Sequence, residues 1–222
     1  MAQQRAEVVQ TNELTWDREV RVWDPLVRVF HWALAVGITA ACVTGWHHRA
    51  MGLHEAAGYG IAGLLLVRAS WGVWGSHYAR FRNFPVHPVQ VVRYLAALVR
   101  GRAARYLGHS PAASAMALGL LLAVLLVAGS GVLAAGGIDL DGPFAFLFPL
   151  VSDRTALAVR HVHDAAPWVL LGMVVLHVLG VIVSSRQHGE NLVRAMVTGN
   201  KPLATPRHGE APLDASDPSV RP

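Results

Sequence analysis

Cysteine is nearly absent from this chain: Cys42 is the only one in 222 residues. A single cysteine excludes an internal disulfide, an iron–sulfur cluster held by several cysteines, and a C-x-x-C-H site for covalent haem. Any redox cofactor must therefore be held by nitrogen ligands, which narrows the field to histidine.

Charge is scarce as well. Charged residues make up 15% of the chain, where a soluble domain is nearer about a quarter. Apolar residues make up 53%, and the mean hydropathy is +0.37. Four stretches reach the length of about 20 residues that a helix needs to cross a bilayer: 26–46, 55–75, 112–134 and 160–184. The sequence predicts an all-α integral membrane protein, a four-transmembrane-helix bundle.

The pI near 10.1 does not indicate nucleic-acid binding, because the basic residues follow a membrane pattern. They gather in the first 28 residues, between residues 80 and 105, and from residue 186 onward. Connections 47–54 and 135–159, together with the adjoining helix ends, hold only three basic residues and five acidic ones. By the positive-inside rule both termini and the 76–110 loop are cytoplasmic. No apolar core with a cleavage site precedes the first span, so we expect no removable signal peptide.

These boundaries give three regions. Residues 1–25 form a cytoplasmic N-terminal tail, 26–186 form the transmembrane bundle, and 187–222 form a cytoplasmic amphipathic segment and a disordered tail. Asp24-Pro25 is typical of a helix start, with an N-cap followed by proline at the first helical position. Residues 86–100 are typical of an interfacial amphipathic helix. The third span has no histidine and no charge, which indicates a packing helix.

Histidine is abundant, with 12 in the chain, and the last span carries three of them. Ionisable side chains inside a membrane are costly and usually mark a functional site. His163 and His177 are 14 positions apart, which is about 40° short of four full turns and about 21 Å along the helix. Both therefore face one side at two depths. His161 points elsewhere and is the weaker candidate.

The first two spans offer one internal histidine each at matching depths. His31 is level with His177 near the cytoplasmic side, and His54 is level with His163 near the outer side. Two histidine pairs facing across a bundle suit two six-coordinate haems. A closed zinc site needs four ligands at one point, which two levels disfavour. The alternative for any single histidine is a hydrogen bond between helices.

Arg68 is a further ionisable residue well inside a span, 14 positions beyond His54 and on the same face. A guanidinium there is suited to pairing with haem propionates. The alternative is an arginine that snorkels to the cytoplasmic surface. His47 or His48, in the outer turn, is the alternative to His54. The remaining histidines lie in predicted connections or tails, and we expect surface positions for His77, His87, His109, His188 and His208.

Several motifs carry a resemblance to a known family: "WDPLVRVFHW", "HEAAGYGIAGLLLVRASWG", "ARYLGHSP", "HVHD", "LHVLGVIVSS" and "HGENLVRAMVTG". The chain resembles the bacterial cytochrome b561 family, in particular its b-type cytochrome subunits of nickel–iron hydrogenase type. The matching segments cover most of residues 22–201. The resemblance implies a bacterial inner-membrane protein with two non-covalent b haems, quinone as substrate, and His31, His54, His163 and His177 as the axial ligands of the haem irons.

The expected function is electron transfer between the quinone pool of a respiratory chain and a periplasmic redox partner, either a c-type cytochrome or a hydrogenase-like protein. An electron-transfer subunit needs no catalytic residue of its own, because the haem carries the chemistry. Trp32, Trp71 and Arg160 are weak candidates for the quinone site. The alternatives are a stand-alone superoxide oxidase, or a non-redox membrane anchor or transporter. The last is disfavoured because the spans lack internal Asp and Glu.

Overall fold

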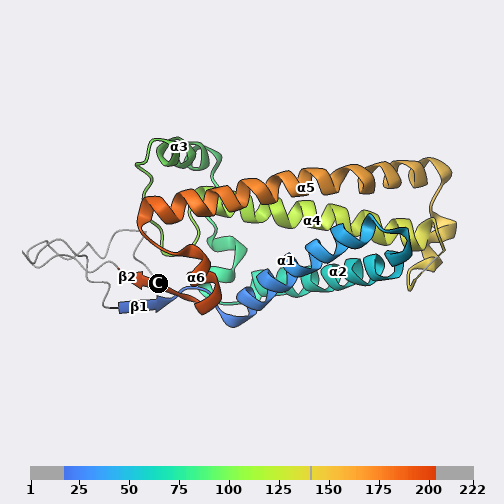
Figure 1. Cartoon of the computed structure of the whole chain (residues 1–222), viewed down its shortest axis with the longest axis horizontal. Coiled ribbons are helices and arrows are strands. Elements are labelled where there is room, and N and C mark those ends of the chain that lie inside the picture. The colour runs from blue at the N-terminus through green and yellow to red at the C-terminus, as the bar shows by residue number, and fades with distance from the viewer. Residues whose placement is uncertain (1–17, 141, 204–222) are drawn as a thin grey trace, which may run out of the picture.

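Four long helices form the body of the protein in a computed structural model that describes residues 18–140 and 142–203. They lie side by side along the long axis of the molecule (Figure 1). Each is long and apolar enough to cross a membrane, which confirms the predicted four-helix architecture. Their bounds are α1 Pro25–Gly45, α2 Met51–Trp74, α4 Pro111–Gly137 and α5 Asp153–His188.

Local sequence signals explain where these helices begin. The Asp24 side chain accepts a hydrogen bond of 2.9 Å from the Val27 amide, and Pro25 opens α1, as predicted. Ser110 and Pro111 start α4 in the same way. Ser152 caps α5, which therefore begins at Asp153, before the predicted residue 160.

The helices pack in the order α1–α2–α4–α5, so α1 and α5 are the outer members of the row. The core lies where α2, α4 and α5 meet and contains Ile61, Leu65, Val124, Ala128 and Leu170. Large apolar side chains also cover the outside of the bundle; Leu66 and Trp168 are 72% and 62% exposed. A bilayer stabilises such a surface, because lipid tails are as apolar as leucine.

Both ends of the described chain lie at one end of the bundle (Figure 1). There strand β1 (Arg18–Arg21) pairs antiparallel with strand β2 (Asn200–Leu203), which follows the short helix α6 (Leu192–Thr198). The all-α prediction did not include this two-stranded sheet. Its partners are about 180 residues apart in sequence, and pairing over that distance leaves no local period in the sequence.

A buried ionic cluster fastens the C-terminal segment to the chain before α4. Arg105 Nε donates to Glu190 Oε1 at 2.7 Å, and Lys201 Nζ lies 3.7 Å from Glu190 Oε2. Lys201 also donates to the Tyr106 carbonyl at 3.1 Å. Glu190 and Lys201 are 7% and 4% exposed, so this contact is an interior one.

The remaining elements are short and connect the helices. At the end with the termini, η3 (His77–Ala79) and η4 (Phe81–Asn83) lead to α3 (Pro88–Val99), the helix predicted for residues 86–100. Val92 and Val99 on α3 are exposed, as an interfacial helix requires. The opposite end is formed by η2 (His48–Ala50) and η5 (Ala145–Leu150).

Candidate functional site

Two pairs of histidines face each other from different helices. His31 on α1 lies beside His177 on α5, with ring centres 6.3 Å apart. His54 on α2 lies beside His163 on α5, with ring centres 5.9 Å apart. Because α5 is a continuous helix, the two pairs are separated by about 21 Å along it. These are the two pairs that depth matching predicts.

The separation within each pair fits one metal ion between two imidazoles. A metal–imidazole bond is about 2 Å long and the ring centre lies about 1 Å behind the nitrogen, so the two ring centres should be about 6 Å apart. A direct N–H···N hydrogen bond of about 2.9 Å would bring them to about 5 Å. The observed 6.3 and 5.9 Å agree with the first arrangement. The side chains therefore fit haem iron.

In the outer pair, the hydrogen bonds engage Nδ1 of each histidine and leave Nε2 free to bind a metal. His54 Nδ1 lies 2.9 Å from the Ala41 carbonyl oxygen, and His163 Nδ1 lies 3.1 Å from that of Val127. A carbonyl only accepts, so each Nδ1 carries the proton and each Nε2 keeps its lone pair. Histidines that bind metal commonly donate their other N–H in this way. In the inner pair, His31 Nδ1 is buried and has no hydrogen-bond partner within the described residues.

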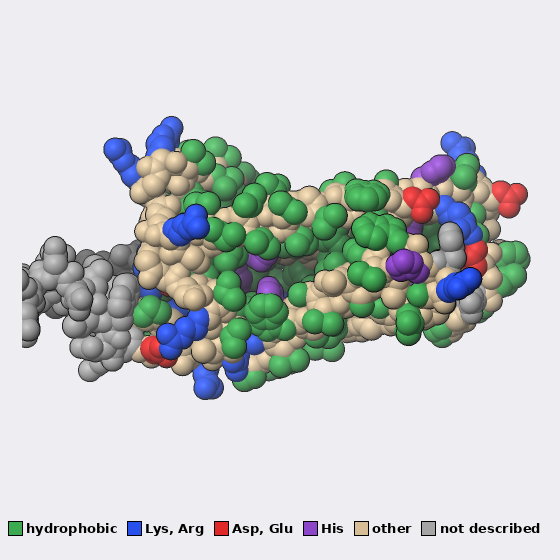
Figure 2. Space-filling view, viewed as in Figure 1, with side chains coloured by type: hydrophobic (Ala, Val, Ile, Leu, Met, Phe, Trp, Pro, Cys, Tyr) green, Lys and Arg blue, Asp and Glu red, His purple; other side chains and the backbone are tan. Residues whose placement is uncertain are grey.

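The surface between α5 and α1 is hollowed, and histidine side chains are visible inside the hollow (Figure 2). The two helices are the ends of the packing row and do not pack closely on each other. Apolar side chains surround the hollow in this view, which suits the apolar body of a porphyrin.

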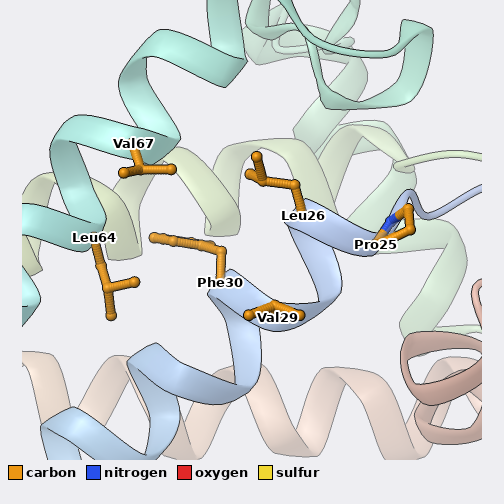
Figure 3. A pocket seen from close by; sticks show the side chains of 6 residues that line it. All are labelled: Pro25, Leu26, Val29, Phe30, Leu64 and Val67. Atoms are coloured by element: carbon orange, nitrogen blue, oxygen red, sulfur yellow. The ribbon is translucent and has the colours of Figure 1, made fainter.

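Two surface grooves lie elsewhere and contain none of the four histidines. One, of about 330 Å³, is lined only by apolar side chains from α1 and α2: Pro25, Leu26, Val29, Phe30, Leu64 and Val67 (Figure 3). A larger one, of about 1130 Å³, continues between the same helices to Val197 of α6 and includes Arg28 and Trp32. The first offers only hydrocarbon contacts and no metal ligand.

Arg68 is buried at the end of α2, with 5% of its surface exposed. Its Nη2 donates to the Ala79 carbonyl at 3.0 Å, and its guanidinium carbon lies 4.4 Å from the centre of the Phe81 ring. The snorkelling alternative is wrong, because the side chain does not reach the surface. Nη1 is buried without a hydrogen-bond partner in the described chain. A role with haem propionates stays a prediction.

The other candidates have ordinary environments. His47 and His161 are exposed, and the His48 side chain lies outside the described part. Trp71 Nε1 donates to Asp24 Oδ2 at 3.0 Å, and Arg160 forms an ion pair with Asp139. These contacts leave the quinone site unassigned. Across residues 18–140 and 142–203, no group of three or more His, Cys, Asp or Glu side chains converges on one metal position.

Two histidines predicted to be on the surface are not. His109 is partly buried between the Trp23 and Phe84 rings, whose centres are 4.7 and 4.4 Å from its own. His188 lies in the last turn of α5, where its two ring nitrogens contact the Ser184 and Ala103 carbonyls. The prediction failed because it treated each connection as solvated, whereas the connection before α4 packs against the residues before α1 and against the end of α5.

Comparison with known proteins decides the family. The model of the prokaryotic cytochrome b561 family matches residues 22–199, which include all four histidines. The chain belongs to this family. This b561-family cytochrome is a multi-pass membrane protein, and membership implies haem b as cofactor and electron transfer as activity.

Its relatives include two proteins named as probable Ni/Fe-hydrogenase B-type cytochrome subunits. The b561-family cytochrome is 28% identical to the one from Bradyrhizobium diazoefficiens over 217 residues, covering 82% of this chain and 85% of the relative. It is 24% identical to the one from Cupriavidus necator over 210 residues, covering 80% and 85% respectively. No solved structure gives a significant match.

Sequence reasoning missed the part that α4 takes in the site. The prediction treated α4 only as a packing helix because it carries no histidine and no charge. In this cytochrome, however, the Val127 carbonyl and the Ser130 hydroxyl of α4 both lie within hydrogen-bond distance of His163 Nδ1. Backbone carbonyls have no side-chain signature, so only the Ser130-Gly131 dipeptide could have drawn attention to this position.

Proposed function

We propose that this chain is a dihaem b-type cytochrome of the bacterial inner membrane that transfers electrons between the quinone pool and a periplasmic redox protein. The observation that carries the proposal is the presence of two histidine pairs, each spaced for one iron, about 21 Å apart along α5. His31 and His177 would hold one haem, and His54 and His163 the other. When bound, the haems supply one-electron chemistry.

The protein supplies position and environment for that chemistry. The two histidine pairs lie about 21 Å apart along α5, so two haems held there would form a path between the two membrane faces. The apolar side chains around the hollow exclude water. Arg68 Nη1, which is buried and unpartnered in the described chain, would pair with a propionate of the inner haem.

The partner follows from the relatives and from the ends of the bundle. Two relatives are named as Ni/Fe-hydrogenase cytochrome subunits, so a nickel–iron hydrogenase is the first partner to test and a c-type cytochrome the second. Lys and Arg side chains gather at the end with both termini, and acidic and basic side chains mix at the other (Figure 2). We assign the basic end to the cytoplasm.

A stand-alone superoxide oxidase would need a basic funnel at the outer end to steer the anion. Arg160 is one of few basic residues there, and Asp139 neutralises it. This contact favours a protein partner over superoxide.

The test is rapid-mixing spectroscopy of the purified cytochrome in liposomes. Quinol in the bilayer should reduce the haems, and the oxidised periplasmic partner added outside should then reoxidise them. His163→Ala should keep reduction by quinol and lose electron transfer to the partner, whereas the exposed His161→Ala should behave as wild type. Fast reduction by superoxide, with no response to any partner, would replace this proposal by the oxidase.

A further inference from the structure

The two outer histidines both rest against a glycine of a neighbouring helix. A Cβ atom added to Gly45 on α1 would lie 3.0 Å from His54 Nδ1. One added to Gly131 on α4 would lie 2.8 Å from His163 Cε1. Both distances are shorter than ordinary van der Waals contact. Each ring therefore occupies space that any other residue would fill.

On both helices, the glycine follows the carbonyl that accepts from the histidine by the same number of residues. The acceptor for His54 is the carbonyl of Ala41, four residues before Gly45, and the acceptor for His163 is that of Val127, four residues before Gly131. A hydroxyl residue directly precedes each glycine, Thr44 in one case and Ser130 in the other.

This arrangement has a physical reason. In a helix the carbonyl of residue i already accepts from the amide of residue i+4, and the side chain at i+4 lies close to that oxygen. Glycine at i+4 opens the approach, so an imidazole from another helix can reach the second lone pair. The glycine and the carbonyl therefore act as one unit.

The hydroxyl completes the unit on α4. Ser130 Oγ lies 2.7 Å from the Leu126 carbonyl and 3.2 Å from His163 Nδ1. Its one proton goes to the carbonyl, since a carbonyl can only accept, which leaves an oxygen lone pair for the Nδ1 proton. His163 Nδ1–H therefore has two acceptors, Val127 O and Ser130 Oγ.

We propose that Gly45 with the Ala41 carbonyl on α1, and Ser130-Gly131 with the Val127 carbonyl on α4, form one cradle that positions the outer histidine pair and tunes the outer haem separately from the inner one. The proposal rests on the proposed function, in which these histidines hold a haem. Gly45, Ser130 and Gly131 are positioning residues, because they act through the histidines.

The inner pair has no such cradle. His31 Nδ1 is buried without a partner in the described chain. No described glycine has His31 or His177 among the closest neighbours of an added Cβ. An Nδ1–H that donates to an oxygen makes the imidazole a stronger ligand, which stabilises ferric iron. The cradle therefore lowers the midpoint potential of the outer haem alone.

Glycine variants test the positioning role. Gly131→Ala and Gly45→Ala should each lose the outer redox component, about half of the haem, and keep the inner one. The controls are Gly129→Ala on α4 and Gly52→Ala on α2, where an added Cβ meets nothing within 4 Å. Alanine favours helix over glycine, so the controls should keep both components. An outer component that survives Gly131→Ala as fully as it survives Gly129→Ala would overturn the cradle.

Ser130→Ala tests the tuning role even if a glycine variant fails to fold. Its haem content should equal that of wild type, while the midpoint potential of the outer haem rises and that of the inner haem stays unchanged. Ser70→Ala is the control, since Ser70 makes a similar bond to the Leu66 carbonyl away from the histidines. No shift, or an equal shift of both haems, would contradict the tuning. Low-spin signals in electron paramagnetic resonance separate the two proposals: a wild type without two bis-histidine haems refutes the proposed function itself.

Discussion

His31 on α1 and His177 on α5 lie with their ring centres 6.3 Å apart, although α1 and α5 do not pack closely on each other. Two side chains thus approach each other across a gap that their helices leave open. Two histidines that only join packed helices by a hydrogen bond do not need such a gap. A porphyrin held between the two imidazoles does need it.

The pairing predicts which variants behave alike. His31→Ala and His177→Ala should lose the same redox component, and His54→Ala and His163→Ala should lose the other, because each pair shares one iron. Potentiometric titration of the purified variants measures this, with the exposed His161→Ala as control. If His31→Ala and His163→Ala lost the same component, the pairing would be wrong.

The buried cluster at the end with the termini predicts a large stability effect. Glu190→Gln leaves the buried Lys201 without its counter-charge, and removing one member of a buried pair costs about 3–5 kcal/mol. Asp139→Asn breaks the half-exposed pair with Arg160 and should cost about 1 kcal/mol or less. Denaturant or thermal unfolding in detergent measures both.

A second substitution tests whether the unpaired buried charge causes the loss of stability. Lys201→Met added to Glu190→Gln should recover part of the lost stability, because it removes a buried cation that has lost its partner. If Glu190→Gln were no more harmful than Asp139→Asn, the cluster would not fasten the C-terminal segment.

The lowered pKa of His109 should make the stability of the folded protein depend on pH. Burial first, and then the positive charges of Arg68 and Lys201, lowers the pKa of His109 from 6.5 to about 3. The unfolded chain therefore binds a proton that the folded protein does not. This contribution to stability is present above pH 6.5 and is lost as the pH falls toward 3; the loss at pH 5 is about 2 kcal/mol.

His109→Phe keeps the aromatic contacts with Trp23 and Phe84 and removes the titrating group. Unfolding of this variant should lose less stability between about pH 7.5 and about pH 5 than unfolding of wild type. His87→Phe, at an exposed position, serves as control. Parallel pH profiles for wild type and His109→Phe would show that His109 is not responsible.

The orientation in the membrane can be measured with single cysteines. In a Cys42→Ser background, Arg49→Cys and Arg93→Cys place thiols at exposed positions at opposite ends of the bundle. The positive-inside rule predicts that an impermeant thiol reagent labels position 49 in intact spheroplasts and position 93 only after permeabilisation. The reverse pattern would place both termini outside.

The sequence predicts those features of the fold and the site that follow from hydropathy or from the spacing of residues along one helix. The four spans follow from hydropathy, and the two histidine levels follow from a spacing of 14 on one helix. The start of α1 follows from Asp24-Pro25, whose cap the structure contains. Each of these signals depends only on residues that are close in sequence or on one helix.

Features that depend on tertiary contacts are not predictable in this way. The β1–β2 sheet joins segments near the two termini, and Glu190 meets Arg105 across 85 residues. The acceptors of the outer histidines are mostly backbone carbonyls, which every residue has. Ser130 and Gly131 are small residues like many others in α4, and only their contacts with His163 show that they belong to the site.

The haem content of the purified chain tests the central claim most directly. Pyridine haemochrome analysis, combined with a protein assay of the same sample, gives the number and type of haems per polypeptide. Two non-covalent b haems per chain are the result that the two histidine pairs predict. One haem per chain, a haem linked through Cys42, or no haem at all would contradict it.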